Sequence, residues 1–165
     1  MRKLFGTVAL VGMLVMPGIA HAQLTVGPIA AFHDDFDFGI GGYVGIPVPA
    51  LDENLSINPS FVYFFPEVGD FWELNGDVVY RFEVSDDTPV LPFAMAGLNI
   101  ARFSTPSVTV GGVTVGGSNT ELGLNLGGGI EFRAESLAPF VGAKFEIQDG
   151  SGFVVFGGIG FSVGG

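Results

Sequence analysis

The residues whose types and spacing could bind a cation or move a proton begin with a single histidine and its acidic neighbours. His33 is the only histidine after residue 22, and Asp34, Asp35 and Asp37 follow it. Carboxylate oxygens are the ligands that Ca²⁺ and Mg²⁺ prefer, so this acidic turn could hold such an ion and, through it, a phosphate group. No second histidine lies at metal-ligand spacing, however. We therefore expect His33 and its neighbours to be a solvated turn, and we assign no catalytic, cofactor-binding or metal residues.

Six further charged residues lie on the polar side of segments in which polar and apolar residues alternate. They are Asp77, Arg81, Glu83, Glu131, Lys144 and Glu146. Charges on one face of such segments could form a proton or ion path, or a paired network that fills a closed interior. Because an unpaired buried ion is costly, we expect the paired network.

The composition excludes several classes of function. The chain of 165 residues has no cysteine, which rules out disulfides and thiolate chemistry. Its 17 acidic residues outnumber six basic ones, and the formal net charge of −11 argues against nucleic acid as a partner.

The first 22 residues have the pattern of a secretory signal peptide. Arg2 and Lys3 precede an apolar segment at 4–20, and Ala20-His21-Ala22 forms a small-x-small cleavage site. We predict cleavage before Gln23, which leaves one domain, 23–165. That domain has four basic residues against 17 acidic ones, a formal net charge of −13.

The segment 71–84, FWELNGDVVYRFEV, shows which element must position the charges. Trp72 and Val78 share one parity, whereas Glu73, Asp77 and Arg81 share the other. A period of two over fourteen residues predicts one long β-strand with an apolar and a charged face. A strand that crosses a membrane needs about 9–11 residues.

The same alternation continues along the chain, and after residue 22 no apolar run is long enough for a membrane helix. The pattern predicts eight strands, at 24–32, 38–46, 55–65, 71–84, 89–103, 119–133, 138–147 and 152–163. Short turn-forming segments separate them, and we expect the longer connection at 104–118 to be an outer loop. In the fifth strand, Asn99 and Arg102 have opposite parity and cannot both face inward without a bulge.

The distribution of side chains favours a barrel whose apolar face points outward. An eight-stranded barrel is only wide enough to be filled by its own side chains, and the many Phe, Leu and Ile residues would overfill it. The polar face is built largely from Gly, Ser and Asn, which suit a narrow interior. A soluble barrel with apolar residues inside is the alternative, but glycine with few charges makes a poor solvent surface.

Together, the signal peptide, the strand 71–84, the Pro-Phe pairs at 92–93 and 139–140, and the run 122–132 resemble the small outer-membrane β-barrels of Gram-negative envelopes. This OmpA-like and OmpX-like family implies an all-β, eight-stranded antiparallel up-and-down transmembrane β-barrel in the bacterial outer membrane. It implies outer-membrane lipid, lipopolysaccharide and the barrel assembly machinery as partners, and we expect a monomer. One departure is the end of the chain, where Ser-Val-Gly-Gly follows Phe161 in place of a terminal aromatic residue.

The resemblance leaves three functions open. Barrel enzymes of this size that modify lipid A use a histidine with a serine or a second acid, and His33 with Ser104, Ser107 or Asp34 could imitate that. A narrow porin-like channel for small solutes or ions is suggested by the glycine-rich face. We favour a non-enzymatic protein with a structural or surface-interaction role, without cofactor, in which the 104–118 loop makes the contacts.

Overall fold

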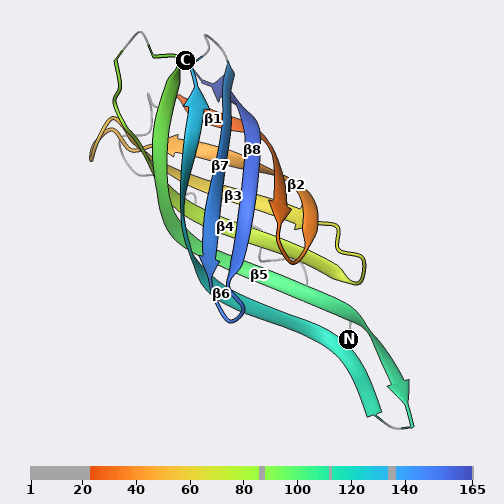
Figure 1. Cartoon of the computed structure of the whole chain (residues 1–165). Coiled ribbons are helices and arrows are strands. Elements are labelled where there is room, and N and C mark those ends of the chain that lie inside the picture. Colours follow the sequence, from red (N-terminus) through yellow and green to blue (C-terminus); the bar gives the residue numbers. More distant parts are fainter. Residues whose placement is uncertain (1–22, 86–87, 112, 134–136, 165) are drawn as a thin grey trace.

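The chain folds into a closed barrel of eight antiparallel strands, each paired with its neighbours in sequence, and β1 closes on β8 (Figure 1). This computed structural model describes residues 23–85, 88–111, 113–133 and 137–164. The strands are β1 (Leu24–His33), β2 (Asp37–Pro47), β3 (Leu55–Phe64), β4 (Asp70–Arg81), β5 (Val90–Val110), β6 (Val113–Phe132), β7 (Leu137–Ile147) and β8 (Gly152–Val163). The predicted eight-stranded up-and-down barrel is confirmed. The predicted signal peptide, 1–22, lies outside the described residues.

The connections between strands gather at two ends of the barrel (Figure 1). The β1–β2, β3–β4, β5–β6 and β7–β8 connections share what we call the ribbon end. The β2–β3 connection lies at the opposite end, together with the ends of β4, β6 and β8 and the starts of β5 and β7, and we call it the terminal end. Among the described residues, no helix is long and apolar enough to cross a membrane.

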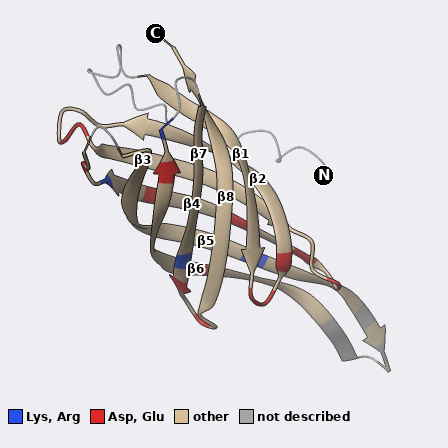
Figure 2. Cartoon of the chain, turned by 45° about the horizontal axis from the view of Figure 1, so that its top comes forward, with Lys and Arg blue, Asp and Glu red and all other residues tan. Residues whose placement is uncertain are grey.

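The outer wall carries the apolar side chains, and the middle of the interior carries polar ones. Leu98, Leu122 and Phe145 are 54%, 69% and 61% exposed, whereas Glu73 and Asn125 are fully buried. In Figure 2, acidic residues lie at several of the connections, and most of the length of the strands carries no charged residue. This is the orientation that the alternation of residue types predicts.

β5 and β6 continue beyond the barrel wall as a two-stranded ribbon (Figure 1). They are 21 and 20 residues long, whereas the other strands have 10 to 12. β4 pairs with β5 only as far as Ser104, but β5 and β6 pair with each other as far as Val110 and Val113. The prediction of a loop at 104–118 is therefore wrong, because β5 and β6 extend into this segment as paired strands. Alternating Val and Thr flank a Gly-Gly pair there, a pattern that favours a hairpin.

A β-bulge interrupts the ribbon shortly after it leaves the barrel. The register shifts between Thr105 and Val108, where Pro106 and Ser107 lie opposite the single Gly116. Proline cannot donate to the strand ladder, and the φ of 102° at Gly116 is a conformation that glycine adopts without steric cost. An extra residue on one strand bends it, so the bulge sets the direction of the ribbon.

No bulge lies between Asn99 and Arg102 of β5, although the two residues have opposite parity. The pairing of β5 with β6 is continuous across both residues. Asn99 points into the barrel and is fully buried, whereas Arg102 is partly exposed and its guanidinium donates to Thr120 at 3.4 Å and to Ser118 at 3.1 Å.

Candidate functional site

A layer of buried polar side chains crosses the middle of the barrel. Each is at most 6% exposed, and the members are Glu73, Asn75, Asp77, Asn99, Asn125, Lys144 and Glu146. Residues two apart on a strand point to the same face, which is why β4 alone contributes three of them. The predicted residues Asp77, Lys144 and Glu146 lie in this layer. Glu73 shares their parity and could have been assigned to the network from the sequence.

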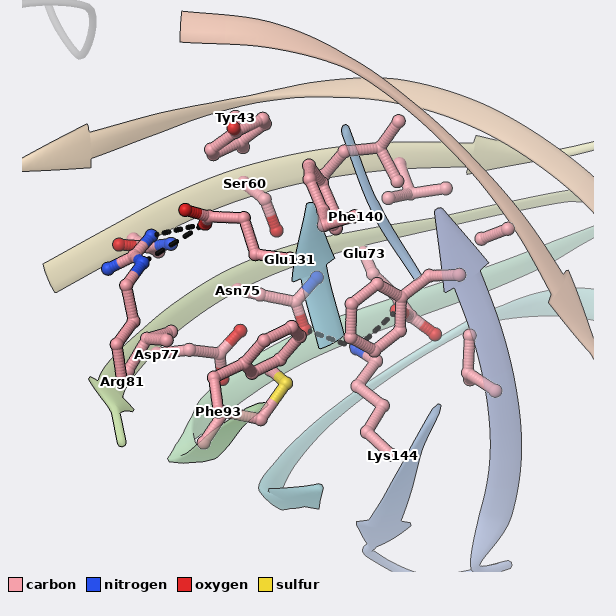
Figure 3. A pocket seen from close by; sticks show the side chains of 18 of the residues that line it. Tyr43, Ser60, Glu73, Asn75, Asp77, Arg81, Phe93, Glu131, Phe140 and Lys144 are labelled. Atoms are coloured by element: carbon pink, nitrogen blue, oxygen red, sulfur yellow. Dashed lines mark hydrogen bonds and ion pairs between the residues drawn. The ribbon is translucent and has the colours of Figure 1, made fainter. Parts of the chain in front are cut away.

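Lys144 connects the layer (Figure 3). Its Nζ lies 2.6 Å from Glu146 Oε1 and 3.3 Å from Glu73 Oε2, and it donates a hydrogen bond of 2.9 Å to Asn75 Oδ1. Coulombic attraction is strong in such a low-dielectric interior, and the loss of one partner would leave a buried charge unpaired. One ammonium group therefore holds β4 and β7 together.

Asn125 extends the same network to β6. Its Nδ2 donates to Asn75 Oδ1 and to Asp77 Oδ1, each at 2.9 Å. Asn125 Oδ1 and both amide atoms of Asn99 make no hydrogen bond in the described structure, so the network is only partly satisfied.

His33 lies inside the barrel, and the expectation of a solvated turn histidine is wrong. The residue is 1% exposed, because it ends β1 on the inward parity of Ala31. The Asp35 N–H donates to His33 Nδ1 at 3.0 Å, and His33 Nε2 lies 3.7 Å from Glu146 Oε2. The imidazole fits because Gly152 of β8 lies beside the ring, and a Cβ there would lie 2.6 Å from Nε2.

Ser104 and Ser107, the alternative partners of His33 in the sequence, lie on β5 where it leaves the barrel. Ser104 is opposite Asp70 of β4, and Ser107 is exposed at the bulge. Within the described contacts, the hydrogen bonds and ion pairs of His33 involve aspartate and glutamate residues, not these serines.

Arg81 and Glu131 form a second ion pair toward the terminal end (Figure 3). Arg81 Nε and Nη2 each lie 3.0 Å from Glu131 Oε2, and Nη1 donates to Ser56 Oγ at 2.9 Å. Glu83 does not join this network, which corrects the prediction. β4 ends at Arg81, so the parity no longer holds, and the exposed Glu83 accepts a hydrogen bond of 3.0 Å from Asn54 Nδ2.

Aromatic rings close the interior at the ribbon end. The rings of Phe36 and Phe71 stack with centroids 3.8 Å apart. The His33 ring lies 4.9 Å from Phe36, 5.8 Å from Phe64 and 5.6 Å from Phe71. Phe64 and Phe71 are at most 2% exposed, so the imidazole is shielded from solvent on this side.

The interior that remains is small. A cavity of about 70 Å³ lies beside Asn75, Asp77 and Lys144 and is also lined by Tyr43 and Phe140 (Figure 3). It has room for a few water molecules and polar groups to hold them. A small cavity is expected in an eight-stranded barrel, because its own side chains fill the interior.

The ribbon differs from the rest of the surface in charge. Residues 103–120 include no Asp, Glu, Lys or Arg, in a chain with 17 acidic residues. β6 pairs with β7 only from Leu124 to Glu131, so in the described structure β6 has no neighbouring strand on that side from 113 to 123. This edge presents backbone donors and acceptors at which a further strand could pair.

Comparison with known proteins identifies the fold. No protein-family profile and no curated protein sequence matches the chain. The N-terminal β-barrel domain of Pseudomonas aeruginosa OprF is similar in structure, with a TM-score of 0.67 and 17% identity, covering 87% of this chain and 100% of that one. Neisserial surface protein A gives 0.62 and 14%, covering 86% and 97%. Ail, the attachment invasion locus protein of Yersinia pestis, solved with the heparin analogue sucrose octasulfate, gives 0.55 and 13%, covering 86% and 97%. The chain has the fold of the small eight-stranded outer-membrane barrels.

Proposed function

We propose that this protein is an outer-membrane β-barrel without enzymatic activity, whose interior is structural and whose β5–β6 ribbon makes contacts at the cell surface. The observation that carries the proposal is the combination of an apolar outer wall with an uncharged ribbon beyond it. Closure of the barrel pairs the backbone within the wall, as hydrocarbon requires. Outer-membrane lipid and lipopolysaccharide then surround a monomer that the barrel assembly machinery inserts.

The ribbon suits recognition of an extended polypeptide. A free strand edge binds such a segment through main-chain hydrogen bonds, and side chains on alternate positions add specificity. The absence of charge from 103–120 fits an uncharged partner segment. Ail is named for attachment, which supports a surface role, but a polyanion such as its heparin analogue does not suit a chain with a net charge of −11.

Cysteine labelling tests the location and orientation, because the chain contains no cysteine. We expect Ser107→Cys, in the ribbon, to react with a membrane-impermeant maleimide on intact Gram-negative cells. Glu53→Cys, in the β2–β3 connection at the terminal end, is the matched control and should react only after permeabilisation. The reverse pattern would contradict the proposed orientation, and equal labelling of both in the soluble fraction would contradict the membrane location.

A shortened ribbon tests the contact role. Ser104 and Ser118 lie opposite each other, so replacing 105–117 by Asn-Gly closes the hairpin in register. We expect cells that display this variant to lose at least tenfold in binding to one another and to host-cell monolayers. The heat-modifiable gel mobility of the barrel should stay unchanged. Undiminished binding would remove the ribbon from the proposal.

A narrow channel is the second candidate function, favoured by the polar layer around Lys144. The aromatic rings at the ribbon end and the small cavity oppose it. We expect no discrete conductance steps from the refolded protein in a planar bilayer. Steady conductance steps would make the channel the favoured function.

A further inference from the structure

We propose that the interior of the barrel binds one divalent first-row transition-metal ion, for which Zn²⁺ is the probe, between His33, Glu73 and Glu146. One potential ligand atom from each of these residues lies within 4.8 Å of the other two, and each residue is at most 1% exposed. They come from β1, β4 and β7, so no local sequence spacing indicates the site. The proposal departs from our expectation that the chain has no metal site.

The first argument is that these side chains have polar atoms without hydrogen-bond partners. His33 Nε2, Glu73 Oε1 and Glu146 Oε2 are buried and make no hydrogen bond in the described structure. A buried polar atom without a partner is costly, and most such atoms in native proteins have one. Three such atoms in one cluster fit a missing partner, and a cation could be that partner once Nε2 has given up its proton.

The second argument is charge. In the central layer, Glu73, Asp77 and Glu146 bring three carboxylates, whereas Lys144 brings one ammonium group. Arg81 is paired with Glu131 toward the terminal end and does not balance them. Three carboxylates against one ammonium group leave a formal excess of two negative charges, which a divalent cation would cancel.

The third argument is geometry. Lys144 Nζ forms ion pairs with Glu146 Oε1 and Glu73 Oε2. The second oxygen of each carboxylate is therefore left for another partner. Ligands about 2.1 Å from a tetrahedral Zn²⁺ lie about 3.4 Å from each other. The His33 Nε2 to Glu146 Oε2 distance of 3.7 Å is close to that value. Small side-chain movements would complete the site.

The surroundings of His33 fit a ligand role. In the cation-free ring the Asp35 N–H donates to Nδ1, so the ring proton is on Nε2. Binding of a cation at Nε2 would put the ring proton on Nδ1, so that the Asp35 N–H would lose its acceptor and Nδ1–H would donate to Asp34 Oδ1, which lies 3.2 Å away. A carboxylate that orients a metal-binding histidine in this way is common.

The donor set selects the class of ion. One imidazole nitrogen with two carboxylate oxygens suits Zn²⁺ or a neighbouring transition metal, whereas Ca²⁺ takes six to eight oxygen ligands. The rings of Phe36 and Phe71 cover the site, so an ion would enter during folding or slow opening of the ribbon end. The ion would then link β1, β4 and β7 as a structural element.

A second cluster competes for the same histidine. His33, Asp34 and Asp35 also place ligand atoms within 4.8 Å of one another, and both aspartates are exposed. An ion there would bind Nδ1, because this nitrogen faces the aspartates. The two sites therefore differ in the ring nitrogen that binds the metal.

Nitrogen NMR separates the two sites in the otherwise unchanged protein. We would refold the full chain carrying His21→Gln, so that His33 is the only histidine, with ¹⁵N-labelled histidine and with or without one equivalent of Zn²⁺. We expect Zn²⁺ to shift the Nε2 resonance, to place the proton on Nδ1 and to stay bound through desalting. A metal-bound Nδ1 with the proton on Nε2 would overturn the proposal in favour of the turn. An unchanged ring at millimolar Zn²⁺ would overturn it in favour of protons that balance the charge.

Matched variants locate the carboxylate ligands. Glu146→Gln and Glu73→Gln should weaken Zn²⁺ binding at least tenfold, whereas Glu131→Gln makes the same change elsewhere in the interior and should leave it unchanged. Asp35→Asn should also bind Zn²⁺ normally. Loss of binding in Asp35→Asn with retention in Glu146→Gln would contradict the proposed site. If a glutamine variant fails to fold, Zn²⁺ binding by Asp35→Asn and the nitrogen resonances of the His33 ring still distinguish the two sites.

Discussion

Lys144 and Glu146 lie two residues apart on β7, and their Nζ and Oε1 atoms are 2.6 Å apart inside the barrel. The side chains are 7% and 0% exposed. Removing the cation would leave Glu73 and Glu146 buried without their partner. We expect Lys144→Met to lower the free energy of unfolding by about 3–5 kcal/mol, measured by urea unfolding in lipid vesicles. The triple variant with Glu73→Gln and Glu146→Gln should recover most of this loss, and failure to recover any would contradict the pairing.

The Arg81–Glu131 ion pair should contribute less to the free energy of unfolding than the ion pairs of Lys144. These side chains are 25% and 17% exposed, so water screens the charges, and a lone partner remains partly hydrated. We expect Arg81→Met to cost about 1 kcal/mol in the same urea assay. A cost equal to that of Lys144→Met would mean that the terminal end is as dry as the central layer.

Gly152 should be intolerant of a side chain. An added Cβ would lie 2.6 Å from His33 Nε2, so Gly152→Ala must displace the imidazole and should cost about 1–3 kcal/mol. Gly76→Ala is the matched control, because a Cβ there meets nothing within 4 Å, and it should be neutral or stabilising by about 0.5 kcal/mol. Urea midpoints and the His33 ring resonances would report both effects. Equal stability of the two variants would show that His33 can move without cost.

A charge on the outer wall should lower the stability of the barrel more when it lies closer to the middle of the membrane. Leu126 lies midway along the wall segment of β6, opposite Ala96 and Phe145, whereas Leu122 lies nearer the ribbon. We expect Leu126→Arg to lower stability in lipid vesicles by about 2–4 kcal/mol and Leu122→Arg by about 1 kcal/mol or less. If both changes are harmless, the wall does not face hydrocarbon.

The barrel could be predicted because its information is local. Alternation such as that of 71–84 fixes strand, face and parity together, and the strand bounds follow within a few residues except where β5 and β6 extend into the ribbon. The same parity placed Lys144 and Glu146 inside. It failed at Glu83, because parity has meaning only as far as the strand continues, and β4 ends at Arg81.

Two features could not be obtained from parity alone. His33 was predicted to be solvated because Asp34 and Asp35 follow it, but the strand continues one residue further than predicted and turns the imidazole inward. Its meeting with Glu73 and Glu146 depends on barrel closure between β1 and β8. The ribbon was not predicted because 104–118 was interpreted as a connection between strands, although Val and Thr alternate on both sides of the Gly-Gly pair at 111–112.

The pairing of Ser104 with Ser118 marks the point at which β5 and β6 leave the wall of the barrel. Below it, β5 pairs with β4 and with β6, so an insertion in either β5 or β6 would shift a register that belongs to the closed wall. Above it, one residue added to each strand lengthens the ribbon by about 3.4 Å and leaves the wall unchanged. Related barrels should therefore vary in ribbon length in steps of two residues, while the register of the wall stays the same.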